Sequence, residues 1–177
     1  MQLIINVNNK VDMISNYVLT NTKQTCLYNI VVGGDYPSLG GRVAYIFNSN
    51  DSEYVAGETR GIIFSISTTD YHLFYGSMSE GYISGTTWNN ANTLCENLTY
   101  LSKSDWHLPK VIDLQRVLSD PYFYVVGISN SYTWWTIEQV GSSAKTVSFD
   151  TGIEETHLKT SIYYGLPIRY FNCNEYI

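Results

Sequence analysis

The stretch that decides the fold is Trp106-His107-Leu108-Pro109-Lys110-Val111-Ile112-Asp113-Leu114. Pro109 suits the first turn of a helix, and it forces Leu108 into an extended conformation. A helix is therefore predicted from Pro109 onward, with Asp113 near its positive N-terminal end. Its apolar face is formed by Val111, Leu114, Val117 and Leu118, which recur at helical spacing. The run Ser119-Asp120-Pro121 ends this helix.

A second amphipathic helix is predicted upstream, over residues 86–101. A threonine cap precedes its apolar positions, which are Ala91, Leu94, Cys95, Leu98 and Leu101. Runs of β-branched and aromatic residues predict strands on both sides of the helices, at 2–7, 27–33, 42–47, 61–66, 132–137, 145–149 and 161–171. The run 61–66 is the best candidate for a central strand. The order of strands, two helices and strands again indicates an α+β fold rather than βαβ winding.

Residues 106–114 resemble the W-x-L-P-[ST]-x-x-E-L signature of a family of phage and bacterial surface proteins, typified by the C-terminal domain of the bacterial collagen-like adhesin. Further segments resemble motifs of that family in the same order, at 40–46, 61–63, 134–136, 145–152 and 164–171. The resemblance covers about residues 34–171. It implies a C-type-lectin-like fold, in which two helices pack on twisted antiparallel sheets.

Three positions depart from the pattern of the family. Asp113 replaces the usual Glu, and Lys110 replaces the usual Ser or Thr. Leu166 and Pro167 occupy the stretch in which the family has the earlier arginine of its closing strand. The fold tolerates such changes, whereas a ligand-binding role carried by these positions would be lost.

Several large residues are interpreted as the framework of the domain. A tryptophan supplies a large area for burial, which favours a core position over a ligand contact. The framework residues are Trp88, Trp106, Leu108, Pro109, Trp135 and Arg169. Residues 1–33 are expected to form an N-terminal arm or edge hairpin for docking or oligomerisation, and residues 172–177 a tail.

Composition excludes two classes of partner. The chain of 177 residues has a net charge of −6, and its ten Lys and Arg are spread singly, so no basic stripe is expected to bind nucleic acid. Its apolar runs are too short for a membrane span. The 16 tyrosines, with many Asn, Ser, Thr and Gly, are typical of paratopes and sugar-binding surfaces. The alternative is a β-rich fold that uses tyrosine in its strands.

No residue pattern indicates an enzyme, a metal site or a cofactor. His72, His107 and His157 are scattered and have no metal-ligand spacing. Glu154 and Glu155 beside Asp150 offer a carboxylate pair, but adjacent strand residues point to opposite faces, which favours a solvated hairpin. The three cysteines, Cys26, Cys95 and Cys173, form no CxxC motif, so free thiols are expected.

Two activities of similar folds find no support in the sequence. Residues 106–114 also resemble the R-L-P-[ST]-x-x-E-W motif of the formylglycine-generating oxidases, but those enzymes rely on C-terminal cysteines, and only Cys173 lies there. Calcium-dependent C-type lectins use an E-P-N or Q-P-D loop followed by W-N-D, and Trp88-Asn89-Asn90 falls on a predicted helix instead. A glycan would therefore bind by aromatic stacking and hydrogen bonds, without an obligatory metal.

In this fold the long loops between the second helix and the closing strand form the variable surface, so the expected ligand contacts are Tyr122, Tyr124, Tyr132, Glu138 and Gln139. The first hypothesis is a non-catalytic phage virion surface protein whose lectin-like domain recognises a host-surface glycan or protein. The alternative is a structural virion protein, such as a capsid decoration, head-fibre or tail-fibre subunit, that docks onto other virion proteins through residues 1–33. A homo-oligomer is compatible with both. The N-terminus shows no signal peptide, which favours the virion surface over the bacterial cell surface.

Overall fold

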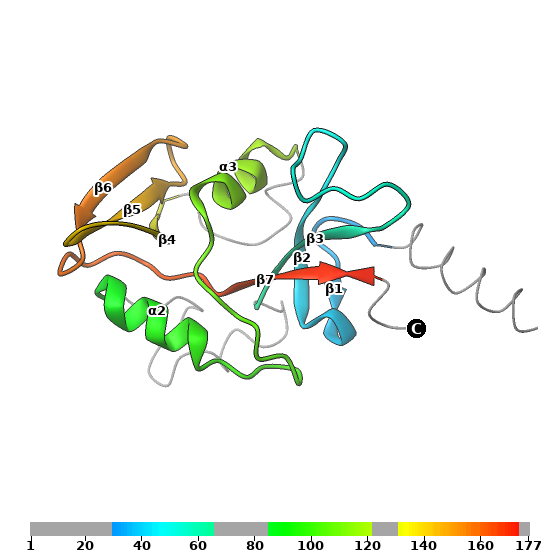
Figure 1. The fold of residues 1–177 in the computed structure, drawn as a ribbon, viewed down its shortest axis with the longest axis horizontal. Coiled ribbons are helices and arrows are strands. Elements are labelled where there is room, and N and C mark those ends of the chain that lie inside the picture. Colours follow the sequence, from blue (N-terminus) through cyan, green and yellow to red (C-terminus); the bar gives the residue numbers. More distant parts are fainter. Residues whose placement is uncertain (1–29, 66–84, 122–130, 174–177) are drawn as a thin grey trace, which may run out of the picture.

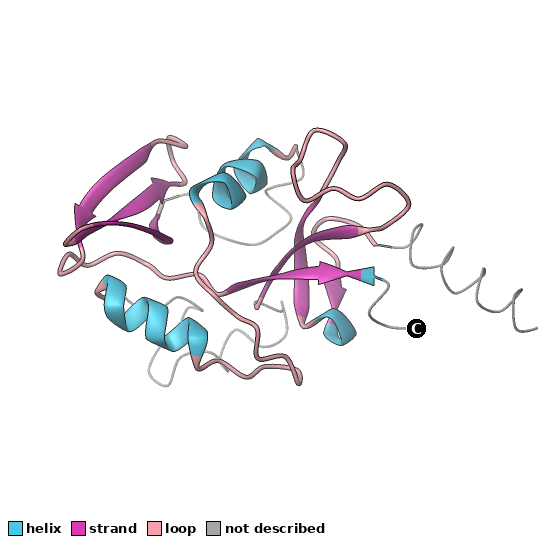
Figure 2. Cartoon of the chain, viewed as in Figure 1, coloured by secondary structure: helices cyan, strands magenta, loops and turns pink. Residues whose placement is uncertain are grey.

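The computed structural model describes residues 30–65, 85–121 and 131–173. These residues form two α-helices and two antiparallel sheets, so the predicted α+β class is confirmed (Figures 1 and 2). In Figure 1 the three-stranded sheet lies at the left and the four-stranded sheet toward the right, and the long segment between β6 and β7 runs from the first to the second. Neither described helix has the length and apolar character needed to cross a bilayer. The expected strand at 2–7 and most of the expected arm lie outside the described residues.

The first sheet contains the predicted central strand. Its order is β1 (Asp35–Tyr36), β2 (Gly41–Ile46), β3 (Arg60–Phe64) and β7 (Ile168–Asn172), and every pair is antiparallel. The short 3-10 helix η1 (Pro37–Leu39) joins β1 to β2. β3 lies between β2 and β7, which confirms the central strand expected at 61–66 as far as the described residues extend. Gly61 is required there, because a Cβ atom would lie 2.0 Å from the carbonyl oxygen of Tyr45 on β2.

The second sheet is a meander of β4 (Thr133–Val140), β5 (Ser143–Ser148) and β6 (Glu154–Leu158). β4 and β5 correspond to the strands predicted at 132–137 and 145–149. β6 was not predicted as a strand. Its sequence, Glu-Glu-Thr-His-Leu, lacks apolar alternation because four of its five residues are exposed.

Helix α2 (Trp88–Glu96) is shorter than the helix predicted at 86–101. Thr87 is its N-cap, and the side chain of Thr87 accepts a hydrogen bond from the backbone N–H of Asn90 at 3.5 Å. The chain then turns at Leu101 and Ser102, which adopt left-handed φ values of 49° and 62°. Mutual backbone hydrogen bonds of 2.9 Å between Tyr100 and Lys103 close this turn. The apolar residues Leu98 and Leu101 therefore continue the helical spacing in the sequence, although the helix itself ends at Glu96.

Helix α3 (Val111–Ser119) lies in the predicted region but begins two residues later than expected, with Lys110 as its N-cap and Pro109 just before it. Val111, Leu114 and Val117 are buried in the main core, and Leu118 packs against that core. The carbonyl of Pro109 accepts a hydrogen bond of 2.8 Å from the backbone N–H of Ile137 on β4. The start of α3 is thereby tied to the second sheet.

The expected framework residues are all buried, namely Trp88, Trp106, Leu108, Pro109, Trp135 and Arg169. Trp88 Nε1 donates to the carbonyl of Thr136 at 2.8 Å, and Trp135 Nε1 donates to the carbonyl of Thr86 at 2.9 Å. These two bonds connect the region of α2 to β4. Buried tryptophans usually need such a partner for the indole N–H.

Arg169 connects β7 to two loops. Its guanidinium forms an ion pair with Asp105 at 2.7 Å and donates to the carbonyl of Leu39, also at 2.7 Å. Burial alone would raise the pKa of Asp105, but the hydrogen bond and charge of Arg169 hold it below its ordinary value. The guanidinium of Arg169 therefore bonds to groups within the fold.

Three expectations need correction. The described part of the predicted strand 27–33 is a turn, in which Gly34 N–H donates to the Val31 carbonyl at 3.1 Å and Gly33 has a φ of 82°. The predicted strand 161–171 is shorter than expected, because the strand β7 begins only at Ile168, after Pro167, which cannot donate a ladder hydrogen bond. Cys95 is a buried free thiol, but Cys173 is disulfide-bonded, so the expectation of free thiols is wrong for Cys173.

Candidate functional site

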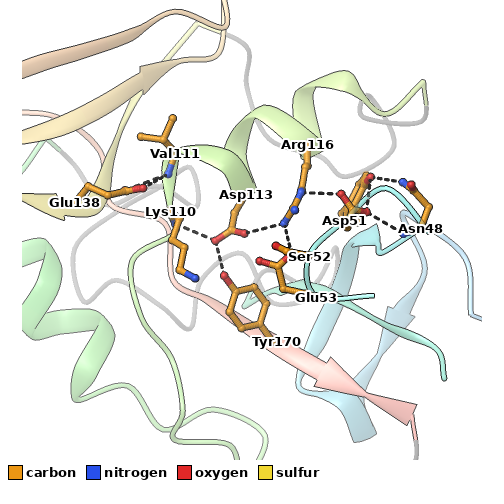
Figure 3. Close-up of polar contacts among 11 residues, drawn as sticks. Asn48, Asp51, Ser52, Glu53, Lys110, Val111, Asp113, Arg116, Glu138 and Tyr170 are labelled. Carbon is orange, nitrogen blue, oxygen red and sulfur yellow. Dashed lines mark hydrogen bonds and ion pairs between the residues drawn. The ribbon is translucent and has the colours of Figure 1, made fainter. Parts of the chain in front are cut away.

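A cluster of charged side chains lies between α3, β7 and the loop after β2 (Figure 3). At its centre is Arg116 of α3, whose side chain is 11% exposed. Its guanidinium contacts Asp51 at 2.9 Å and Glu53 at 2.8 Å, and Asp113 lies 3.9 Å away. The guanidinium carbon also lies 5.4 Å from the centre of the Phe47 ring. One buried cation thus holds three carboxylates from two separate segments of the chain.

The loop after β2 is shaped around Asp51. One oxygen of its carboxylate accepts hydrogen bonds from the Asn48 backbone N–H at 2.8 Å and from the Tyr45 hydroxyl at 3.1 Å. The other oxygen pairs with Arg116. Burial and the neighbouring Asp51 carboxylate raise the pKa of Tyr45, which stays a neutral donor. Asp51 therefore fixes this loop against both β2 and α3.

Asp113 is the most buried carboxylate of the cluster, with a residue exposure of 1%. One of its oxygens accepts a hydrogen bond of 2.9 Å from the Lys110 backbone N–H and one of 2.7 Å from the Tyr170 hydroxyl (Figure 3). Burial raises the pKa of Asp113 above its ordinary value, although these two bonds and the nearby cations oppose the shift. Burial and the charge of Asp113 likewise raise the pKa of Tyr170. The Tyr170 hydroxyl is therefore a fixed donor and does not ionise.

A shallow pocket of about 200 Å³ adjoins this cluster. Two residues of the cluster, Glu53 and Tyr170, contribute to its wall, and the complete lining is Phe47, Glu53, Arg60, Tyr170, Phe171 and Asn172. Outside the lining, the carboxylate of Glu58 accepts hydrogen bonds from Arg60 Nε at 2.6 Å and from Asn172 Nδ2 at 2.9 Å. The pocket thus combines aromatic residues with a carboxylate, a guanidinium and an amide.

Electrostatics set what this pocket can accept. Burial alone would raise the pKa of Glu53, but hydrogen bonds from Ser52, its own backbone and Arg116, with the charge of Arg116, lower it. Glu53 is therefore an ionised acceptor at neutral pH. Such a wall can receive hydrogen bonds from hydroxyl or ammonium groups. Tyr170, the half-buried aromatic residue of the lining, can contact the apolar face of a ring.

Of the five ligand contacts expected from the sequence, the three that the structure describes, Tyr132, Glu138 and Gln139, do not meet at one site. Tyr122 and Tyr124 lie outside the described residues. Tyr132 is half-buried, and its ring centre lies 4.2 Å from that of Tyr164. Gln139 is exposed and accepts a hydrogen bond of 2.6 Å from Lys159 Nζ. Tyr132 precedes β4 and Gln139 lies near its far end, so the strand separates them.

Glu138, the fifth expected contact, has a structural partner. Its two carboxylate oxygens lie 3.0 and 3.1 Å from the backbone N–H of Val111, which has no acceptor within α3 (Figure 3). A carboxylate at a helix N-terminus is also favoured by the helix dipole. Glu138 therefore caps α3 from the neighbouring sheet.

The pocket residues were missed by reasoning from the sequence. Glu53 and Arg60 come from the loop after β2 and from β3, and Tyr170 and Asn172 come from β7. The first pair and the second pair are more than a hundred residues apart in the chain, and no local motif joins them. The only signal was the polar composition of residues 48–57, which was interpreted as a loop.

The remaining polar candidates form local contacts. His157 lies 3.0 Å from Glu155 and 3.1 Å from the Tyr163 hydroxyl. Lys145 pairs with Glu154 at 2.6 Å, so Glu154 and Glu155 have different partners and do not form a carboxylate pair. His107 Nδ1 lies 2.9 Å from the carbonyl of Leu108. Among the described residues, no group of three His, Cys, Asp or Glu side chains could hold a metal ion. His72 lies outside the described residues.

The chain matches no protein-family model and no curated protein. The resemblance in residues 34–171 to lectin-like surface proteins therefore stays a prediction. The geometry of the pocket is the starting point for a function.

Proposed function

We propose that the chain is a non-catalytic recognition domain with a C-type-lectin-like fold, displayed on a phage particle, and that it binds a host-surface glycan in the pocket beside Tyr170. The observation that carries the proposal is the lining of this pocket, in which Phe47, Tyr170 and Phe171 adjoin Glu53, Arg60 and Asn172. Sugars present both an apolar ring face and a set of hydroxyl groups. Aromatic contact and directed hydrogen bonds are the means by which a site recognises both.

The size of the pocket sets the size of the ligand. At about 200 Å³, it lies below the roughly 300–1,000 Å³ of sites for drug-sized ligands. It would therefore hold one terminal sugar ring. At about 0.3 kcal/mol for each of roughly twelve non-hydrogen atoms, one ring would bind with a dissociation constant of the order of millimolar.

The charge around the pocket sets the charge of the ligand. Arg116 is paired with Asp51 and Glu53, and Arg60 is paired with Glu58. An acidic sugar would place another negative charge beside Glu53, whereas hydroxyl and ammonium groups can donate to it. The expected ligand is a neutral or amino sugar.

Placement on a phage particle is supported by the ordered motifs in residues 34–171 that resemble phage and bacterial surface proteins. The α+β arrangement of two helices with two antiparallel sheets is compatible with the lectin-like fold proposed here.

A glycan array with the chain multimerised on beads tests the proposal, since multivalency compensates for weak single-site binding. Binding to neutral or amino sugars is expected, and binding to acidic sugars is not. Saturation-transfer NMR of the best sugar then compares Arg60→Ala and Asn172→Ala with the natural sequence. Each pocket variant should weaken binding by about tenfold, which corresponds to one lost hydrogen bond of about 1.4 kcal/mol.

Two sets of control variants locate the site. Ile162→Ser changes an exposed residue, 58% accessible, that does not line the pocket, and it should bind normally. Tyr122→Ala and Tyr124→Ala test the loop that the sequence favoured, and they should also bind normally. Loss of binding only in the tyrosine variants would move the site to that loop. Absence of binding to every glycan on the array would overturn the proposal.

A further inference from the structure

One edge of the three-stranded sheet is open within the described part of the chain. β6 pairs with β5 on one side, and no described strand pairs with its other side. Figure 1 shows β6 along the outer border of the molecule. Four of its five residues are exposed. An edge strand of this kind presents unpaired backbone groups that can accept another strand.

The register of β6 shows which backbone groups point outward. Ser148 N–H donates to the Ile153 carbonyl at 3.0 Å, and Lys159 N–H donates to the Ser142 carbonyl at 3.1 Å. Residues 153 and 159 therefore bond toward β5. Hydrogen-bonded positions alternate along an antiparallel strand, so residues 155 and 157 also face β5. The N–H and C=O groups of Glu154 and Thr156 and the N–H of Leu158 face away from the sheet. The Leu158 carbonyl accepts a hydrogen bond of 2.8 Å from the Ser161 N–H in the turn after β6.

We propose that β6 pairs with β6 of a second copy of this chain, antiparallel, about a two-fold axis at Thr156. Thr156 then pairs with Thr156 of the second copy, and Glu154 pairs with Leu158. All three outward N–H groups of each copy find an acceptor, which gives six hydrogen bonds and one continuous six-stranded sheet. The Glu154 N–H uses the second lone pair of the Leu158 carbonyl, whose first lone pair accepts from Ser161 N–H.

Side chains favour this register over its neighbours. With the axis at Thr156, Glu155 of one copy lies opposite His157 of the other, so no two like charges face each other. An axis at Glu155 would oppose two glutamates, and an axis at His157 would oppose two histidines. With the axis at Glu155 or His157, one outward N–H of each copy would also have no β6 residue of the second copy opposite it. The register with the most hydrogen bonds is thus also the one with complementary side chains.

The acidic residues of β6 do not prevent this pairing. Charged side chains often protect edge strands from association. Here Glu154 pairs with Lys145 at 2.6 Å, and Glu155 lies 3.0 Å from His157, so both carboxylates already have partners in their own copy. In the proposed register, neither glutamate lies opposite a glutamate of the second copy.

Sedimentation velocity of the full chain over a concentration series tests the proposal, with Thr156→Pro and Thr156→Ala as a matched pair. Proline removes the outward N–H of residue 156 but no bond between β5 and β6, and edge strands tolerate it. Alanine keeps that N–H. A concentration-dependent dimer is expected, weakened about tenfold or more by Thr156→Pro, as for a loss of about 1.4 kcal/mol, and retained by Thr156→Ala.

Amide hydrogen exchange of the same samples shows which edge is covered. The amides of Glu154, Thr156 and Leu158 should become protected as the concentration rises, while those of Glu155 and His157 should be protected at every concentration. Protection of Glu155 and His157 in Thr156→Pro shows that this variant keeps the β5–β6 pairing. A monomer at all concentrations, a dimer that Thr156→Pro leaves intact, or edge amides that stay unprotected would each overturn the proposal.

Discussion

Replacement of Arg116 by methionine tests the polar cluster that shapes one wall of the pocket. The substitution keeps an apolar stem next to Phe47 but removes the cation. It leaves the carboxylates of Asp51, Glu53 and Asp113 without their shared partner, and their side chains are only 8%, 26% and 1% exposed. Breaking a buried ion pair by removing one partner costs about 3–5 kcal/mol. Because Glu53 keeps some contact with solvent, we expect a loss of about 3 kcal/mol.

Urea unfolding followed by tryptophan fluorescence measures this loss, with Arg60→Met as the matched control. The Arg60–Glu58 pair is 36% and 27% exposed, so the control should cost less than about 1 kcal/mol. For a chain of this length, a loss of about 3 kcal/mol lowers the melting temperature by roughly 6–12 °C. Equal losses for the two variants would refute the assignment of Arg116 as the centre of a buried network.

The pH dependence of the same variant has a definite sign. The pKa of Glu53 is lowered in the folded protein, so its stabilising contribution is present above the ordinary pKa of 4.5 and is lost as the pH falls through the folded-state pKa. Arg116→Met removes the charge that helps to lower this pKa. Its cost should therefore be largest near pH 7 and smaller below about pH 4. A cost that grows on acidification would contradict the reasoning.

Three further predictions follow from single side chains. Burial raises the pKa of Asp113 in the folded protein. The resulting contribution of Asp113 to folding stability is fully present below pH 3.8 and is lost as the pH rises through the folded-state pKa. The stability of Asp113→Asn relative to the natural sequence should therefore rise between about pH 3 and pH 7, and a flat difference in urea titrations would contradict this. Trp88→Phe should cost about 1–3 kcal/mol in thermal or urea unfolding, because the Thr136 carbonyl loses its 2.8 Å donor; an unchanged midpoint would argue against that bond. Burial raises the pKa of Cys95 to about 12, so Cys95 should resist alkylation in the native protein, and mass spectrometry should find Cys173 alkylated only after reduction.

Local sequence patterns predicted those helices and strands that bury an apolar face in the core. β3 and α3 lie where the apolar runs and spacing placed them, because burial of that pattern is what stabilises each element. β6 carries no such pattern and was missed. The prediction made α2 too long, because the apolar spacing continues at Leu98 and Leu101, beyond the end of the helix at Glu96. Composition also suggested tyrosines as ligand contacts, but Tyr132 packs against Tyr164. Residue type alone does not distinguish an exposed ring from a packed one.

The pocket was beyond the reach of sequence patterns for a different reason. Its position depends on Arg116, Asp51 and Glu53 meeting across two segments, and on β7 pairing with β3 rather than with its neighbour in the chain, β6. No local spacing encodes that Glu53 and Tyr170 line the same pocket. Charged residues in loops are usually solvated, so their inward placement follows from the folded arrangement alone.

The start of α3 shows what Lys110 and Asp113 do in the deciding stretch. A motif with Ser or Thr at the position of Lys110 and Glu at the position of Asp113 would form a capping box, in which both side chains bond the first backbone N–H groups of the helix. Asp113 keeps one half of this arrangement, since its shorter carboxylate still accepts from the Lys110 N–H at 2.9 Å. A lysine side chain cannot accept a hydrogen bond, so the other half is lost. Glu138 reaches across from β4 to accept from the Val111 N–H. One N–H of the first turn of α3 thus finds its acceptor on the second sheet and not in a local motif. The orientation of α3, and with it Arg116, therefore depends on the packing of β4.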